Sequence, residues 1–170
     1  MTLAEEQVRS RTVTWGDPMV SALEAFRSDG LTFLTKMAAG EIPVAPIASV
    51  LGFDGFEVED GRVTFTIPVH EFHYNPIGTV HGGVLATLAD SAMTCAVQTT
   101  LPVGRGITTL DLSIRFLRPV TADTGRLVCV GEAIHVGRRI GTAEARITDP
   151  QGRLVAHATT TCMVLEGAAQ

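Results

Sequence analysis

The stretch that most constrains the fold is residues 81–100, HGGVLATLADSAMTCAVQTT, which reads as one helix with apolar side chains on nearly every side. A helix of this kind is stable only when other elements enclose it. It nevertheless carries one carboxylate, Asp90, in its middle. A buried charge is costly unless it is paired or used. The rest of the chain must therefore wrap this helix and account for Asp90.

The segments that flank the helix have the period of two that is typical of half-buried strands. Before it, the apolar members of the alternation are Val63, Phe65, Ile67 and Val69. After it, strand patterns cover residues 107–117, 126–136, 139–148 and 153–165. In the first of these, the residues expected to share one face are Leu110, Leu112, Ile114 and Phe116. This order predicts an α+β fold in which an antiparallel sheet wraps around one long helix.

The first 44 residues are expected to form a helical extension of a domain that covers residues 45–170. Asp17-Pro18 is a typical helix start, and the apolar residues after it lie at roughly helical spacing. A second short helix is expected over residues 31–37. The segment that contains Pro43 and Pro46 is expected to be an extended linker. Near the other end, Asp149-Pro150-Gln151-Gly152 predicts a type I turn between the last two strands.

Composition excludes several classes of partner. The formal net charge of -5 argues against a broad basic surface for nucleic acid or for an anionic membrane. The three cysteines, Cys95, Cys129 and Cys162, form no CxxC pair, so we expect reduced thiols and neither a disulfide nor a zinc site. The N-terminus lacks the apolar core of a signal peptide, and no run reaches membrane-spanning length. We expect a cytoplasmic protein.

A polar stripe follows one side of the long helix. In steps of three and four it contains Gly83, Thr87, Asp90, Thr94 and Gln98. A stripe that faces water usually carries several Lys, Glu or Arg residues, whereas the only charge here is the aspartate. The stripe therefore favours a functional site, and an ordinary amphipathic helix remains the alternative.

The start of the helix, His81-Gly82-Gly83, can bring backbone close to a ligand because neither glycine has a side chain. The first N–H groups of a helix lack internal partners and lie at its positive end, so they can stabilise a developing oxyanion. Gly82 and Asp90 are separated by about 12 Å along the axis. Both must lie within about 3 Å of one reacting centre to act together. A joint site would therefore combine two subunits.

Three stretches, HYNPIGTVHGGVLATLADSAM, TLPVGRGITTLDLSIRFLRPV and HVGRRIGTAEARITDPQGRLVAHATTTCMV, resemble the PaaI-type acyl-CoA thioesterases of the hotdog-fold superfamily. The resemblance covers most of the chain after residue 45. It implies a sheet wrapped around a central helix and paired subunits with a continuous sheet, often as a tetramer. It also implies hydrolysis of an acyl-CoA thioester with no metal and no separate cofactor.

The resemblance also implies roles for individual residues. It makes Asp90 the catalytic carboxylate and gives the backbone N–H of Gly82 the task of polarising the thioester carbonyl. His81 would support that turn, and Asn75 would hold the thioester or the attacking water. Two of these roles have structural alternatives, because Asn75-Pro76 could be a simple turn and His81 could only fix the loop.

Further candidates are less distinctive. The resemblance matches Thr108 and Thr94 to positions where relatives place a supporting hydroxyl, although both could serve packing alone. Gly83 would let backbone approach coenzyme A. Arg138 and Arg139 form a local cationic spot suited to the phosphates of coenzyme A, with solvated turn arginines as the alternative.

Hydrolysis of an acyl-CoA is thus the leading hypothesis, with Asp90 either as general base or as nucleophile. The alternatives are a non-catalytic acyl-CoA binding or sensing protein on the same fold, and a hydratase relative. The chain has no G-x-S-x-G elbow, which disfavours a Ser-His-Asp hydrolase. The side chains expected as walls of an acyl pocket are Phe72, Tyr74 and Met93.

Overall fold

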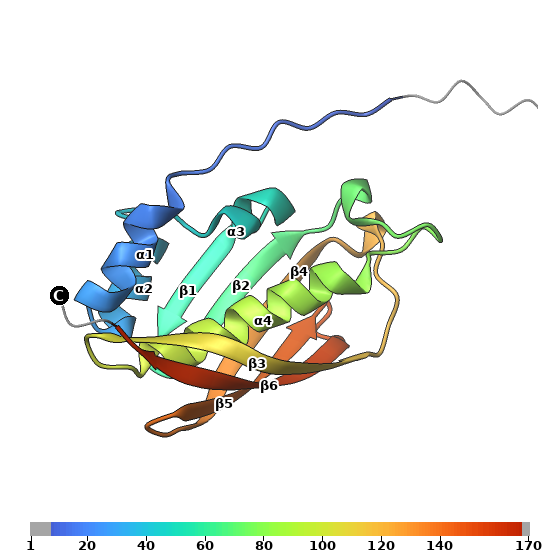
Figure 1. Cartoon of the computed structure of the whole chain (residues 1–170). Coiled ribbons are helices and arrows are strands. Elements are labelled where there is room, and N and C mark those ends of the chain that lie inside the picture. Colours follow the sequence, from blue (N-terminus) through green and yellow to red (C-terminus); the bar gives the residue numbers. More distant parts are fainter. Residues whose placement is uncertain (1–7, 168–170) are drawn as a thin grey trace, which may run out of the picture.

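The computed structural model describes residues 8–167 and shows a six-stranded antiparallel sheet curled around α4, Gly82–Thr99 (Figure 1). The strands are β1 Gly55–Glu59, β2 Arg62–Pro68, β3 Arg105–Phe116, β4 Arg126–Val136, β5 Ile140–Thr148 and β6 Leu154–Glu166. Their order across the sheet is β1-β2-β4-β5-β6-β3. The α+β prediction is confirmed, with β1 as an additional strand that the sequence patterns did not indicate.

The core lies between α4 and the concave face of the sheet. Leu88, Ala92 and Met93 have no exposed surface. A Cβ on Gly131 of β4 would lie 2.4 Å from the backbone oxygen of Ala92, and one on Gly141 of β5 would lie 2.6 Å from a methyl group of Val97. Glycine at these two positions therefore lets the sheet close tightly around the helix.

The edge strand β3 contains a β-bulge between Thr109 and Asp111. The extra residue shifts the alternation of side chains by one position. As a result Thr109 and Leu112 both face α4, while Leu110 is 54% exposed. The expectation that Leu110 shares a face with Leu112 is wrong for this reason.

Three helices precede the sheet: α1 Pro18–Arg27, α2 Gly30–Ala38 and α3 Pro46–Leu51. The N–H of Met19 donates to Oδ1 of Asp17 at 2.9 Å, which confirms the predicted start of α1. Pro46 begins α3 and does not continue an extended linker, because proline has a suitable φ for the first helical position and its missing N–H is not needed there. Figure 1 shows α1 and α2 beside the C-terminal end of α4.

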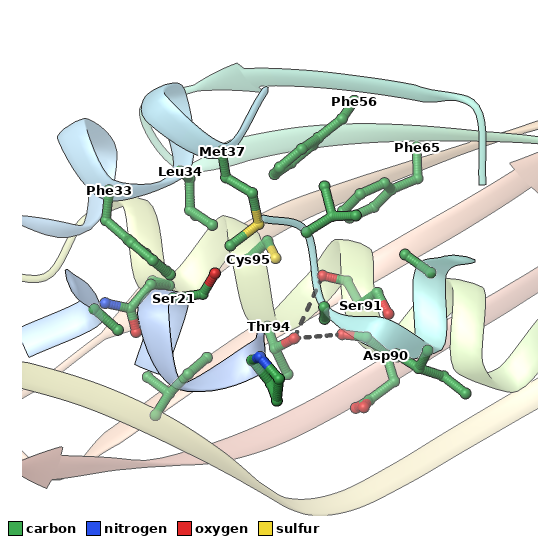
Figure 2. A pocket seen from close by; sticks show the side chains of 18 of the residues that line it. Ser21, Phe33, Leu34, Met37, Phe56, Phe65, Asp90, Ser91, Thr94 and Cys95 are labelled. Atoms are coloured by element: carbon green, nitrogen blue, oxygen red, sulfur yellow. Dashed lines mark hydrogen bonds between the residues drawn. The ribbon is translucent and has the colours of Figure 1, made fainter. Parts of the chain in front are cut away.

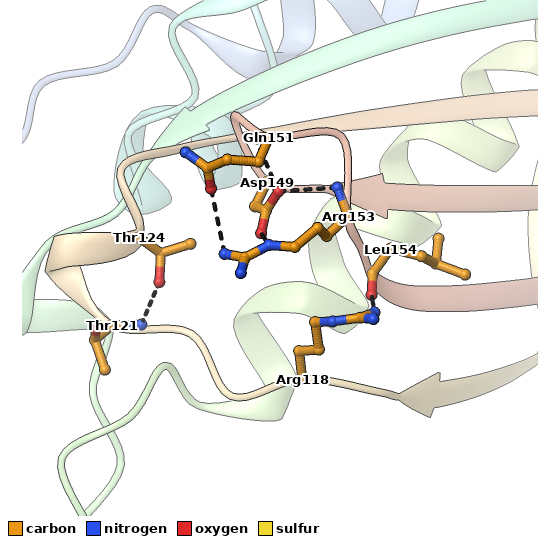
Figure 3. A network of polar contacts seen from close by, with 7 residues as sticks. All are labelled: Arg118, Thr121, Thr124, Asp149, Gln151, Arg153 and Leu154. Atoms are coloured by element: carbon orange, nitrogen blue, oxygen red, sulfur yellow. Dashed lines mark hydrogen bonds and ion pairs between the residues drawn. The ribbon is translucent and has the colours of Figure 1, made fainter.

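The predicted turn between β5 and β6 is confirmed. The N–H of Gly152 donates to the carbonyl of Asp149 at 2.9 Å. The buried Asp149 carboxylate also accepts bonds from the N–H groups of Gln151 and Arg153 and from Nε of Arg153 at 2.6 Å (Figure 3). Arg118, just after β3, donates to the carbonyl of Leu154 and ties this turn to the end of the edge strand.

Two short 3-10 helices, Glu71–His73 and Ala122–Thr124, lie in the connections at the N-terminal end of α4. His73 is buried, and its Nε2 lies 2.8 Å from the carbonyl of Leu51. Its own carbonyl accepts a 2.8 Å hydrogen bond from the N–H of His81, which places the start of α4. None of the helices within residues 8–167 has both the length and the apolar character needed to cross a membrane.

Candidate active site

Asp90 lies half-buried in the middle of α4 and faces the start of β3. Its Oδ1 accepts a hydrogen bond from Oγ1 of Thr109 at 2.8 Å. None of the ion pairs found within residues 8–167 includes this carboxylate. A neutral hydroxyl, and not a cationic side chain, therefore orients Asp90.

The other hydroxyls of the polar stripe bond to the helix backbone. Oγ1 of Thr94 donates to the carbonyl of Asp90 at 2.7 Å, and Oγ1 of Thr87 donates to the carbonyl of Gly83 at 2.9 Å. Thr94 thus contacts the backbone of the aspartate, not its carboxylate (Figure 2). A supporting role for Thr94 in catalysis stays a prediction.

The sequence reasoning selected Thr108 and missed Thr109. Thr108 lines the same cavity as Asp90, but the hydrogen bond to the carboxylate comes from the next residue. The two threonines are adjacent, and strand alternation alone cannot say which one faces the helix once a bulge is present. The adjacent pair of threonines was the sequence feature that could have pointed to Thr109.

The turn before α4 is held by His81, the N-cap residue. Its Nδ1 accepts a hydrogen bond from the N–H of Gly83 at 2.8 Å, and its carbonyl accepts one from the N–H of Val84 at 2.9 Å. This geometry supports the structural reading of His81. The N–H of Gly82 has no hydrogen-bond partner among residues 8–167 and lies at the positive end of the helix.

Asn75 shapes the loop that leads to this turn. Its Oδ1 accepts hydrogen bonds from the N–H groups of Ile77 at 3.0 Å and Thr79 at 3.2 Å. Its Nδ2 donates to Oγ1 of Thr79 at 2.9 Å. The side chain thus builds a local turn, as the structural alternative expected, while it also lines a cavity beside Gly82.

Two separate cavities hold the two halves of the predicted site. Asp90, Thr108 and Thr109 line a cavity of about 510 Å³ (Figure 2). Gly82 and Asn75 line another of about 330 Å³. The predicted oxyanion donor, Gly82, and the carboxylate of Asp90 therefore do not meet within one chain, as the spacing along the helix predicted.

The residues predicted to bind coenzyme A or to form the pocket walls lie outside the cavity of Asp90. Arg138 and Arg139 are exposed in the turn between β4 and β5 and line neither cavity. Gly83 is exposed at the helix start. The possible pocket walls Phe72, Tyr74 and Met93 do not line the cavity of Asp90, and the walls come instead from residues of α1, α2, α3, β1 and β2.

Cys95 also lines the cavity of Asp90, one turn further along α4. Burial raises the pKa of its thiol to about 12, and the negative charge of Asp90 raises it as well. Such a thiol stays protonated at neutral pH and is a poor nucleophile. Asp90 is therefore the group in this cavity with the character of a base or nucleophile.

Comparisons with known proteins match the chain to thioesterases. A sequence model described as "Thioesterase superfamily" matches residues 77–156. The chain is 30% identical to human acyl-coenzyme A thioesterase 13 over 56% of this chain and 68% of that protein. It is 29% identical to the proofreading thioesterase EntH of Cronobacter turicensis over 71% of this chain and 86% of that one.

Among solved structures, the chain is similar to the PaaI protein from the phenylacetic acid degradation operon of E. coli. The TM-score is 0.70 at 25% identity, and the superposition covers 82% of this chain and 96% of that protein. The helix that carries Asp90 and strands β3, β4 and β5 lie inside the region that the family model matches, whereas α1, α2, α3, β1 and β2 lie outside it.

Proposed function

The chain belongs to the thioesterase superfamily and is a hotdog-fold thioester hydrolase, and from this premise we propose that it hydrolyses an acyl-CoA with Asp90 as the catalytic carboxylate. The observation that carries the proposal is the Asp90 side chain itself. It is half-buried, faces a cavity large enough for an acyl group, and is held by a hydroxyl and not by a cation. A carboxylate oxygen is therefore available to take a proton or to attack a carbonyl.

The proposed site is completed by a second copy of the chain, paired through β3. This strand has twelve residues and lies at the edge of the sheet, so its free backbone groups are a template for pairing. Antiparallel pairing about a two-fold axis between Leu112 and Ser113 sets Thr109 opposite Phe116 of the partner subunit. The start of one β3 then faces the end of the other.

This pairing brings together the two groups that a single chain keeps apart. Thr109 holds the carboxylate of Asp90. The ring of Phe116 lies over Gly82, since a Cβ on Gly82 would be 2.9 Å from its Cζ. Two complete sites per dimer result, each with the carboxylate of one subunit and the helix N-terminus of the other. The four-subunit form would add a second dimer without changing this site.

In the proposed reaction the free N–H of Gly82 polarises the thioester carbonyl and stabilises the oxyanion that forms on it. By one route Asp90 removes a proton from water while the water oxygen attacks the carbonyl carbon. The carbon–sulfur bond then breaks, and the sulfur leaves as the thiol of coenzyme A with a proton. By the other route the carboxylate attacks the carbonyl carbon and expels coenzyme A as its thiolate, which takes up a proton. Water then hydrolyses the resulting anhydride to the free acid and the Asp90 carboxylate. Neither route uses a metal or a separate cofactor.

We assign the phosphates of coenzyme A to Arg138 and Arg139. The carbonyl of Arg139 accepts a hydrogen bond from the N–H of Val164, which pairs with Ile107 near the start of β3. In the proposed dimer that end of β3 faces the Gly82 turn of the partner subunit. The chain has a net charge of -5, so an exposed pair of arginines is a distinct local attraction for phosphate.

A thiol-trapping assay with a panel of acyl-CoA substrates tests the proposed function directly. Hydrolysis releases one thiol per turnover, and we expect Asp90→Asn to abolish most of that signal. Binding of acyl-CoA without thiol release by the wild type would favour the sensing protein. Consumption of an enoyl-CoA without thiol release would favour the hydratase. We place the reaction in the cytoplasm, where acyl-CoA and reduced cysteines are both found.

A further inference from the structure

The cavity that contains Asp90 is roofed by the N-terminal helices. Along α4 it follows Asp90, Thr94 and Gln98, and opposite them lie side chains of α1 and α2 (Figure 2). Its apolar walls include Ala25, Phe33, Leu34, Met37, Phe56 and Phe65. The volume of about 510 Å³ is within the usual range for small-molecule sites.

Apart from Thr108 of β3, the polar side chains in the wall already have partners in the protein. Oγ of Ser21 donates to the carbonyl of Pro43 at 2.5 Å, and Oγ of Ser91 donates to the carbonyl of Thr87 at 2.8 Å. Nε2 of Gln98 donates to the carbonyl of Arg105 at 3.3 Å. Beyond Asp90 the cavity therefore offers mainly apolar contact, which suits a hydrocarbon chain better than a charged or hydroxylated group.

The roof is fixed in place by three contacts. Nζ of Lys36 in α2 binds Oε1 of Glu24 in α1 at 2.6 Å. The N–H of Gly30 donates to the carbonyl of Leu101 at 2.9 Å, and a Cβ on Gly30 would lie 1.6 Å from the backbone oxygen of Gln98. Helix α2 thus rests directly on the C-terminal end of α4, and α1 is tied to α2.

Helix α1 turns small side chains toward the cavity and larger ones away from it. Ser21 and Ala25 line the cavity, whereas Val20 and Leu23 are each 46% exposed. A surface helix usually buries its bulky apolar side. The reverse arrangement here leaves open space between α1 and α4. That space forms the part of the cavity that lies farthest from Asp90.

The length of the cavity indicates the size of its ligand. From Asp90 to Gln98 is eight residues, or about 12 Å of helix. An extended chain advances roughly 1.2 Å per covalent bond. The cavity therefore accommodates a straight chain of about eight to ten carbons with its carbonyl at Asp90.

We propose that α1 and α2 form the acyl pocket of this enzyme and select unbranched, apolar acyl groups of about eight to ten carbons. The proposal rests on the proposed function, because it places the acyl carbonyl at Asp90. The far end of the pocket is marked by Ala25. The next residue, Phe26, contacts Gly106 through its ring, and its carbonyl accepts a hydrogen bond from the N–H of Gly104.

The test is the dependence of kcat/KM on acyl length. Each methylene that enters the pocket should raise kcat/KM up to about fourfold, so the wild type should favour octanoyl-CoA and decanoyl-CoA over butyryl-CoA and phenylacetyl-CoA. Ala25→Leu fills the far end and should lower the ratio of kcat/KM for decanoyl-CoA to that for butyryl-CoA by about tenfold or more. Ala38→Leu makes the same change on the exposed side of α2, outside the cavity, and should leave the ratio unchanged.

A second variant should act in the opposite direction. Met37→Ala enlarges the cavity, so the preferred chain should become longer than in the wild type. A general loss of stability would lower activity on all substrates and could not produce opposite shifts in the two variants. Equal loss on butyryl-CoA and decanoyl-CoA in Ala25→Leu, or the same change of ratio in Ala38→Leu, would overturn the assignment of the pocket.

A binding measurement separates this proposal from the proposed function. Decanoyl-CoA should raise the Tm of the Asp90→Asn variant, and it should do so far less when Ala25→Leu is added. If the wild type hydrolyses no acyl-CoA but the Tm shift follows this pattern, the hydrolysis proposal fails and the pocket stands. If hydrolysis occurs and neither chain length nor Ala25→Leu affects rate or Tm shift, the pocket fails and hydrolysis stands.

Discussion

Oγ1 of Thr109 donates a 2.8 Å hydrogen bond to Oδ1 of Asp90, and this contact joins the middle of α4 to the inward face of β3. It exists because the bulge after Thr109 changes which side chains of β3 face the helix. The hydroxyl restrains one carboxylate oxygen and leaves the carboxylate on the wall of the cavity. Thr109 is therefore a positioning residue for Asp90.

Thr109→Val removes this hydroxyl while keeping the shape of the side chain. A hydrogen bond to a charged group contributes about 1.5–3 kcal/mol, so kcat should fall about ten- to hundredfold with little change in KM. Thr109→Ser should recover most of the rate because it restores the donor. The matched control is Thr108→Val in steady-state assays, and a larger loss there would show that the hydroxyl of Thr108 is the functional one.

Asp90→Asn should keep the fold and substrate binding while lowering kcat by about 10²–10⁴, because an amide can neither accept the proton nor attack the thioester. Circular dichroism and steady-state kinetics measure the two effects. Near-wild-type turnover would leave Asp90 as a structural group. A single turnover of the wild type in oxygen-18 water then tests the two routes: label in the Asp90 carboxylate indicates the anhydride, and label found only in the released acid favours the general base.

Mixed dimers test the shared site. A chain with Asp90→Ala and a chain with Gly82→Pro should each be nearly inactive, but a heterodimer regains one complete site. With random pairing of equal amounts, about a quarter of wild-type activity should return. Proline is tolerated at the first helical position, where it removes the N–H and adds a Cβ beside Phe116.

Gly82→Ala is the matched control for that experiment, because it introduces the same Cβ beside Phe116 but keeps the N–H. It should retain clearly more activity than Gly82→Pro. Full activity of a stable monomer, or mixtures no more active than their components, would contradict the two-subunit site.

Arg138→Ser together with Arg139→Ser should raise KM for an acyl-CoA if these residues bind its phosphates. KM for a short acyl thioester that lacks the nucleotide should stay almost unchanged, since it carries no phosphate. Arg146→Ser removes an exposed arginine from the outer face of β5 and serves as control. Equal effects on both substrates would assign Arg138 and Arg139 to stability alone.

Acid should destabilise the protein through His73. Burial lowers the pKa of this imidazole below its usual value of 6.5, although its bond to the carbonyl of Leu51 acts in the opposite sense. Protonation therefore favours the unfolded chain. The stability that the neutral ring contributes is complete above the unfolded pKa and is lost as pH falls from about 6.5 through the folded pKa.

Urea unfolding at pH 7.5 and pH 5 measures this effect as a lower midpoint at the lower pH. His73→Gln cannot gain a proton, so its midpoint should change less between the two pH values. The same slope in both proteins would show that other groups control acid unfolding. Because the carbonyl of residue 73 binds the N–H of His81, activity should decline before global unfolding.

Much of the fold could be predicted because its determinants are local. The apolar sequence of α4, the alternation in β2, β4, β5 and β6, and the Asp17 cap are each encoded within a few neighbouring residues. Strand β1 escaped prediction because only part of its surface is buried, so its sequence shows a weak alternation. The linker expected around Pro46 was wrong because proline begins a helix as readily as it interrupts one.

The candidate site, like the fold, could be predicted from the sequence only in part. The sequence by itself determined that one carboxylate lies on an apolar helix, eight residues after a glycine at the helix start, and that one chain cannot bring the two together. Only the tertiary structure decided that Thr109 and not Thr108 holds Asp90, and that α1 and α2 roof the cavity beside it. A bulge and a cavity arise where segments distant in sequence pack against each other, and their shape depends on contacts that no local pattern contains.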